Sequence, residues 1–195
     1  SLLLAASLGR TTLMAAGLGL LLAWAYSAPP LRLKQNGWWG NAACGLCYEG
    51  LAWATGAAVM AGGAMPEARS LALAALYSWG AHGIMTLNDF KSVKGDRQMG
   101  VASLPVQLGV DGAARNASLM MALPQIVVIV LLVVWQAPWH AAGVAALLVA
   151  QGVLMRWFMA SPVERALFYS GFGVPLFVAG MMVSAFALRS AGVST

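Results

Sequence analysis

The stretch Asn88-Asp89-Phe90-Lys91-Ser92-Val93-Lys94-Gly95-Asp96-Arg97-Gln98-Met99-Gly100 lies between long apolar runs on both sides. It gathers two carboxylates and three basic side chains in a chain of which only 9% is charged. A cluster of both signs at such a break needs a physical reason. Carboxylates beside lysine and arginine suit a divalent cation that carries a diphosphate.

The composition outside this stretch sets the class of protein. Of the 195 residues, 61% are hydrophobic, and the mean hydropathy is +0.77. A soluble domain of this length cannot bury so much apolar surface, so the surrounding medium is lipid. Helices are expected because every backbone group must be paired within lipid. The sequence therefore predicts an all-α, polytopic transmembrane helical bundle forming a single domain over residues 1–195. About six spans are expected, at Leu13–Ala28, Asn41–Met65, Ser70–Leu87, Ala117–Gln136, Ala141–Met159 and Leu167–Leu188.

Six successive spans place three connecting loops at one end of the bundle: Pro29–Trp39, Asn88–Asn116 and Ala160–Ala166. Eight of the eleven basic residues fall near these loops, namely Arg32, Lys34, Lys91, Lys94, Arg97, Arg115, Arg156 and Arg165. The other end has three, Arg10, Arg69 and Arg189. The positive-inside rule makes the richer end cytoplasmic. Residues 88–116 are predicted to form a long cytoplasmic loop, in which Val101–Gly109 caps the mouth of the bundle.

Asp89 and Asp96 are the candidate catalytic residues and metal ligands. On a continuous helix their spacing puts them on one face, about 10 Å apart, and a break at Gly95 would bring them closer. Mg²⁺ takes a few carboxylates together with waters and substrate phosphates. Nearby basic side chains would neutralise charge on a departing phosphate: Lys91, Lys94 and Arg97. The alternative is a solvated helix end with weak local ion pairs.

The loop before this motif contributes two more basic residues. Pro29 and Pro30 are expected to end the preceding helix and hold the following segment extended. Arg32 and Lys34 alternate along that segment and would reach one anion together. An ordinary positive flank of a membrane span is the alternative.

Ionisable and sulfur-containing side chains also occur inside the predicted spans. Glu49 and His82 are costly in lipid and should face the bundle interior or a wet cavity. His82 precedes Asp89 by nearly two helical turns, so it would lie on the same face about 10 Å deeper. It either lines the cavity below Asp89 or joins two helices by a hydrogen bond. Cys44 and Cys47 lack further ligands nearby, so no zinc site is expected.

Two motifs resemble those of the UbiA-type intramembrane prenyltransferases. Asn88-Asp89-Phe90-Lys91, followed by Gly95-Asp96-Arg97 and Ser103-Leu104-Pro105-Val106, resembles their second aspartate motif. Tyr26-Ser27-Ala28-Pro29-Pro30-Leu31-Arg32-Leu33-Lys34 with Asn36-Gly37-Trp38 is similar to their preceding cytoplasmic loop. Within that superfamily, the two motifs most resemble those of chlorophyll and bacteriochlorophyll synthases. Gln98-Met99-Gly100-Val101 and Leu104-Pro105-Val106-Gln107-Leu108-Gly109 lean toward the bacteriochlorophyll branch.

The resemblance implies a nine-helix bundle whose fourth to ninth helices match the six spans. It further implies Mg²⁺ as cofactor, and transfer of a geranylgeranyl or phytyl group from its diphosphate to the propionate of a bacteriochlorophyllide. Asp89 and Asp96 would bind the metal, and the diphosphate would contact Arg32, Lys34, Lys91 and Arg97. The substrate cavity would be lined by Asn88, His82 and Tyr26.

The implied location is a bacterial inner or photosynthetic membrane, with the loops of the site facing the cytoplasm. The lipid bilayer and other membrane proteins of pigment synthesis or photosystem assembly are the implied partners, and no nucleic acid is expected.

Two features depart from the family pattern. The first aspartate motif is absent, so the chain is expected to be shortened at its N-terminus and inactive on its own. Lys94 stands where these synthases are expected to carry an acid, and Val93 stands where many relatives with other acceptors carry Asp.

Two alternatives stay open from the sequence. One is an aromatic or quinone prenyltransferase of the same superfamily, which would differ in its acceptor and cavity lining. The other is a non-catalytic membrane transporter or assembly protein, whose activity would survive loss of Asp89 and of Mg²⁺.

Overall fold

The computed structural model describes residues 1–191, with side chains as far as Arg189. This part of the chain is helical and contains no strand; the only extended pairing in it is an isolated bridge between Asn36 and Ala102. The α-helices are α1 (Leu2–Ser7), α2 (Arg10–Ser27), α3 (Gly37–Gly45), α4 (Ala52–Met60), α5 (Ala68–Asp89), α6 (Val93–Met99), α7 (Leu104–Val134), α8 (Pro138–Ala160) and α9 (Pro162–Ala191). A 3₁₀ turn η1 (Leu33–Gln35) precedes α3, and a π-helical turn η2 (Leu46–Leu51) joins α3 to α4.

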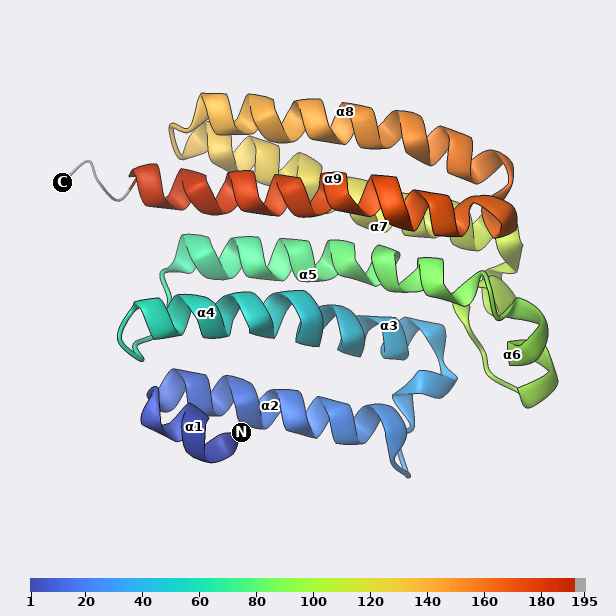
Figure 1. The fold of residues 1–195 in the computed structure, drawn as a ribbon, viewed down its shortest axis with the longest axis horizontal. Coiled ribbons are helices and arrows are strands. Elements are labelled where there is room, and N and C mark those ends of the chain that lie inside the picture. The colour runs from blue at the N-terminus through green and yellow to red at the C-terminus, as the bar shows by residue number, and fades with distance from the viewer. Residues whose placement is uncertain (192–195) are drawn as a thin grey trace.

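The long helical segments lie side by side along the long axis of the molecule (Figure 1). They are α2, the continuous α3–η2–α4 segment, α5, α7, α8 and α9, and each contains most of one predicted apolar run. The all-helical fold is therefore confirmed. By length and apolar composition, three helices can cross a membrane: α7, α8, and α9 as far as Arg189. The count of six spans stays a prediction.

The prediction of a long loop over residues 88–116 is wrong. Helix α5 continues to Asp89, α6 occupies most of the charged stretch, and α7 begins at Leu104. Pro105 lies in the first turn of α7, where its missing N–H has no helical partner to lose. The predicted break at Gly95 is also wrong, because Gly95 lies inside α6. The chain instead reverses between Asp89 and Val93, and α6 ends where Gly100 adopts a φ of 68°.

The segment after Pro30 is not extended as predicted. Helix α2 does end at Ser27, just before the prolines, but Arg32 then adopts a left-handed φ of 39°. The Arg32 N–H donates to the Ala28 carbonyl over 3.0 Å, and the Gln35 N–H donates to the Arg32 carbonyl over 2.9 Å. These turn hydrogen bonds curl the chain, so Arg32 and Lys34 are not alternate positions of an extended segment.

The two segments that carry the predicted motifs are joined by backbone hydrogen bonds. The Gly37 N–H donates to the Ala102 carbonyl over 2.8 Å, and the Ala102 N–H donates to the Gln35 carbonyl over 2.9 Å. A Cβ atom on Gly37 would lie 2.5 Å from the Leu104 nitrogen, so only glycine permits this approach. The start of α3 is thereby held against the start of α7. Both lie at the end of the bundle from which α6 projects (Figure 1).

Candidate active site

Asp89 is held by three elements at the end of the bundle. It is the last residue of α5 and is partly buried. The side-chain amide of Asn41 on α3 donates to its Oδ2 over 3.3 Å. The backbone N–H of Leu104, at the start of α7, also donates to the Asp89 carboxylate. A carboxylate with donors from two other helices has a fixed orientation.

Asp96 lies in the first turn of α6 and is buried, with 8% of its surface exposed. Ser92 Oγ donates to Asp96 Oδ2 over 2.9 Å and lies 3.2 Å from the backbone carbonyl of Asp89. The turn between α5 and α6 thus folds the second carboxylate back toward the first. A turn, and not a continuous helix, connects the two acids. Their joint role as metal ligands stays a prediction.

The two acids are close enough to interact electrostatically. Asp89 lies outside the predicted span, which ends at Leu87. Its carboxyl is nevertheless partly buried, and this burial raises its pKa to about 6. The charge of Asp96 raises this pKa further, whereas the hydrogen bonds from Asn41 and Leu104 oppose the rise. Neither carboxylate has a Lys or Arg nitrogen within 4.0 Å in the described part of the chain. A cation close to Asp89 and Asp96 would therefore stabilise their charged forms further.

The donor set fits a Mg²⁺ ion shared with a substrate. Mg²⁺ is commonly bound by one or two carboxylates, with water and substrate phosphates completing its shell. Asp89 and Asp96 provide that number. No group of three or more His, Cys, Asp or Glu side chains suited to a metal occurs among residues 1–189. The arrangement therefore suits a metal that is held jointly with a phosphate ligand.

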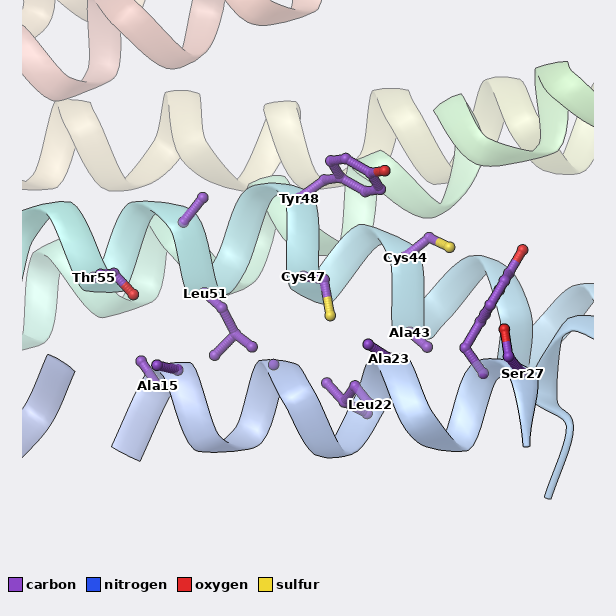
Figure 2. Close-up of a pocket in the computed structure, with 14 residues that line it drawn as sticks. Ala15, Leu22, Ala23, Ser27, Ala43, Cys44, Cys47, Tyr48, Leu51 and Thr55 are labelled. Atoms are coloured by element: carbon purple, nitrogen blue, oxygen red, sulfur yellow. The ribbon is translucent and has the colours of Figure 1, made fainter. Parts of the chain in front are cut away.

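A cavity of about 710 Å³ lies between α2 and the α3–η2–α4 segment (Figure 2). Its walls are mostly small or apolar, and the lining comprises Ala15, Ala16, Gly19, Leu22, Ala23, Tyr26, Ser27, Ala43, Cys44, Cys47, Tyr48, Leu51, Ala52 and Thr55. Tyr26 and Cys44 interact with each other, and both lie close enough to Asp89 to interact electrostatically with it. One end of the apolar cavity is therefore close to Asp89, and Ala15 and Thr55 lie toward the other end.

The three residues predicted to line a substrate cavity have different surroundings. Tyr26 lines the 710 Å³ cavity, whereas Asn88 and His82 lie outside that lining. Asn88 is exposed on the last turn of α5. His82 is buried, its Nε2 forms a hydrogen bond of 3.2 Å with the Trp38 carbonyl, and its ring packs against the Trp38 ring. His82 therefore joins α5 to α3, which is the helix-packing role left open above.

The predicted diphosphate-binding residues lie on two segments of the chain. Arg32 and Lys34 are exposed on the curled segment before α3. Lys91, Lys94 and Arg97 line a separate hollow of about 500 Å³, which α6 forms together with residues of α7 and α9. Neither Asp89 nor Asp96 is part of that lining. Their contact with a diphosphate at the carboxylates stays a prediction.

Sequence reasoning missed Asn41 and Ser92, the two side chains that donate to the carboxylates. A signal for Asn41 was present. It is a polar residue at the start of the apolar run Asn41–Met65, and polar residues in membrane segments commonly mark sites. Ser92 had no comparable signal, because a serine in a turn is ordinary.

The profile of the UbiA prenyltransferase family matches residues 1–177. The chain is 56% identical over 171 residues to the bacteriochlorophyll synthase 33 kDa chain of Cereibacter sphaeroides, an alignment that covers 88% of this chain and 56% of that protein. It is 46% identical over 191 residues to the 33 kDa chain of Rhodobacter capsulatus, covering 97% of this chain and 63% of that one. The chain thus spans roughly three fifths of the length of these relatives.

A solved structure described as a digeranylgeranylglyceryl phosphate synthase in membranes has the same fold. It superposes with a TM-score of 0.76 over 96% of this chain and 65% of its own length, at 20% sequence identity. At that identity the likeness concerns the fold alone.

Proposed function

The chain belongs to the UbiA prenyltransferase family, and we propose that it acts as a Mg²⁺-dependent bacteriochlorophyll synthase. The reaction would transfer a geranylgeranyl or phytyl group from its diphosphate to the propionate of a bacteriochlorophyllide. The observation that carries the proposal is the partly buried Asp89, which interacts electrostatically both with the buried Asp96 and with Tyr26 and Cys44 of the apolar cavity. The similarity to two bacteriochlorophyll synthase chains supports the choice of acceptor.

The proposed chemistry follows from these surroundings. The allylic carbon–oxygen bond of the isoprenoid diphosphate breaks, its electron pair leaves with the diphosphate, and a propionate oxygen forms the new ester bond to the allylic carbon. Mg²⁺ would supply positive charge for the leaving diphosphate. Asp89 and Asp96 would hold that ion, and Asn41 would fix the orientation of Asp89. The propionate is ionised at neutral pH, so no general base is required.

The cavity between α2 and α3–η2–α4 would hold the isoprenoid tail. Its volume of about 710 Å³ is within the range of ligand sites, and its small apolar walls would shield an allylic cation from water. Tyr26 and Cys44 mark the end next to Asp89, where the reacting carbon would lie. The loops at this end would face the cytoplasm, as the excess of basic residues indicates.

The test is ester formation in membranes that contain the complete gene product, supplied with labelled geranylgeranyl diphosphate, bacteriochlorophyllide and Mg²⁺. Asp89→Asn should reduce the rate at least a hundredfold, because removing a group that stabilises transition-state charge costs about 10²–10³ in rate. Asp111→Asn is the matched control, since Asp111 is an exposed acid on α7, and it should retain full activity. Chelation of divalent ions should also stop the reaction.

Equal activity of the two variants would contradict the proposal. Transfer to a small phenol or naphthoate in preference to bacteriochlorophyllide would indicate the aromatic prenyltransferase instead.

A further inference from the structure

The hollow of about 500 Å³ around α6 is separate from the cavity beside Asp89. Three cationic side chains, Lys91, Lys94 and Arg97, line it together with Phe90, Val93, Gln98, Val110 and Val163. We propose that this hollow binds the phosphate group of an anionic membrane phospholipid. The proposal goes beyond the transfer reaction and does not depend on it.

The charge of the hollow favours an anion. Its lining contains three cations and no carboxylate, and none of the three has an acidic partner within 4.0 Å in the described part of the chain. Asp96 is on the same helix, but it is buried and accepts a hydrogen bond from Ser92. Lysine and arginine side chains gathered in this way form charge-assisted hydrogen bonds with phosphate oxygens.

Three further acids are next to lining residues in sequence, and none of them lines the hollow. Asp89 precedes Phe90, and its carboxylate accepts a hydrogen bond from Asn41 on α3. Asp111 and Glu164 each follow a lining residue, Val110 and Val163, but both are exposed and neither contributes to the lining. Their carboxylates reduce the net charge of the region while the inner wall of the hollow remains cationic.

The apolar half of the lining distinguishes a lipid from a free phosphate ion. Val93, Val110 and Val163 offer no side-chain hydrogen bond to an inorganic anion, but they can cover glycerol and the first carbons of an acyl chain. Phe90 is 1% exposed and packs edge-on against Phe158 of α8, with ring centroids 5.5 Å apart, so this wall is anchored in the bundle.

The position of the hollow also suits a lipid headgroup. It is formed by α6, the first turns of α7 and the start of α9, at the end of the bundle where the apolar rods stop (Figure 1). Basic pockets at the cytoplasmic ends of membrane helices are common sites for anionic headgroups, with each Lys or Arg near the surface contributing about 1 kcal/mol.

The experiment measures the lipid retained by the purified complete protein. The protein is reconstituted in nanodiscs of phosphatidylcholine with phosphatidylglycerol, re-extracted in mild detergent and analysed by native mass spectrometry. Lys94→Gln should reduce retained phosphatidylglycerol by about fivefold, as expected for one lysine at a lipid surface. Lys94→Arg should retain it. Arg156→Gln, an exposed arginine on α8 outside the hollow, is the matched control and should bind as the unmodified protein does.

Three results would overturn the proposal. The first is equal phosphatidylglycerol retention by Lys94→Gln and the unmodified protein, when thermal unfolding in detergent shows both to be folded. The second is displacement of the lipid by millimolar inorganic phosphate, which would make the hollow a free-anion site. The third is displacement by geranylgeranyl diphosphate with Mg²⁺, which would assign the hollow to the transfer reaction. The experiment measures bound lipid and not ester formation. The lipid proposal can therefore fail while the proposed transferase activity stands, and the activity can fail while the lipid proposal stands.

Discussion

Asn41 on α3 donates from Nδ2 to Oδ2 of Asp89 at the end of α5, over 3.3 Å and across 48 residues of sequence. The same amide lies 3.2 Å from Thr86 Oγ1, whose hydroxyl in turn donates to the His82 carbonyl over 3.0 Å. Asn41 is buried, so its amide has little access to competing water. One carboxylate of the candidate site is thereby aligned by a side chain from a different helix.

Replacing Asn41 with leucine should therefore impair transfer more than folding. Without the amide, Asp89 keeps its charge but loses a fixed orientation, and loss of such a supporting partner typically costs 10–100-fold in metal affinity or activity. We expect the Mg²⁺ concentration for half-maximal ester formation to rise by about tenfold or more. The measurement is a Mg²⁺ titration of the initial rate.

Thr86→Val provides the control for this prediction. It removes the second acceptor of the Asn41 amide but leaves the hydrogen bond to Asp89 in place. A normal Mg²⁺ requirement is expected for it. If both variants shift the titration equally, general loosening of the α3–α5 contact, and not alignment of Asp89, explains the effect.

Gly19 is predicted to set the room available for the isoprenoid tail. It lines the 710 Å³ cavity from α2, and a Cβ atom there would lie 3.7 Å from Leu51 Cδ1 on the opposite wall. A leucine at position 19 would extend into the cavity about two helical turns away from Tyr26. We expect Gly19→Leu to lower kcat/KM for geranylgeranyl diphosphate by about 10–200-fold, the range for apolar pocket changes. A C10 diphosphate, which ends before this point, should be affected less.

Gly17→Leu is the matched control on the same helix. A Cβ atom at Gly17 meets nothing within 4 Å, and Gly17 does not line the cavity. Its kinetics should be unchanged with either donor. Equal losses for the long and the short donor in Gly19→Leu would show that the tail does not occupy this cavity.

The arrangement of helices was largely predictable, because it depends on runs of apolar residues that are long compared with any turn. The local path at the end of the bundle was not. Gly95 was expected to break a helix, yet it lies inside α6, and the chain turns at Ser92 instead. Prolines fix their own φ and restrict the preceding residue, so they predicted the end of α2 but not the left-handed conformation of Arg32.

The candidate site was predictable in part for a related reason. Charged residues are rare in this chain, so Asp89 and Asp96 were conspicuous. The residues that position them are neutral. The polar Asn41 in an apolar run was a signal, but its partner was not predictable, because Asn41 reaches Asp89 only through the packing of α3 against α5. Lys91 and Arg97 line a hollow that also includes Val163, at the start of α9. That hollow likewise depends on tertiary packing, so it was not predictable from the sequence around α6.

A polar network inside the C-terminal helices should contribute measurably to stability. Gln125 on α7 donates to Gln151 on α8 over 2.7 Å, and Gln151 donates to the Tyr169 hydroxyl on α9 over 3.0 Å; all three are fully buried. Gln151→Leu would leave the other two without this partner. We expect the free energy of unfolding in detergent to fall by about 1–3 kcal/mol, the cost of unsatisfied buried groups.

Two further variants make this prediction specific. Tyr169→Phe removes a single hydroxyl and should cost about 1 kcal/mol or less, close to the average for hydrogen bonds between membrane helices. Gln98→Leu changes an exposed glutamine on α6 and should be neutral. Equal unfolding free energies for Gln151→Leu and Gln98→Leu would show that the network contributes nothing beyond packing.

The contact between α5 and α7 should depend on the absence of a side chain at Gly83. A Cβ atom there would overlap the carbonyl oxygen of Ala117 and lie 2.9 Å from Met121 Cγ. A backbone carbonyl cannot move aside as a flexible side chain can. Gly83→Ala should therefore lower the free energy of unfolding by about 1–3 kcal/mol, as overpacking usually does. Gly171→Ala on α9 is the matched control, because its Cβ would meet nothing within 4 Å. It should be neutral or stabilising by up to about 1 kcal/mol through helix propensity. Opposite signs for these two glycines would show that α5 and α7 pack backbone against backbone, whereas equal signs would show that the helices can separate to admit a methyl group.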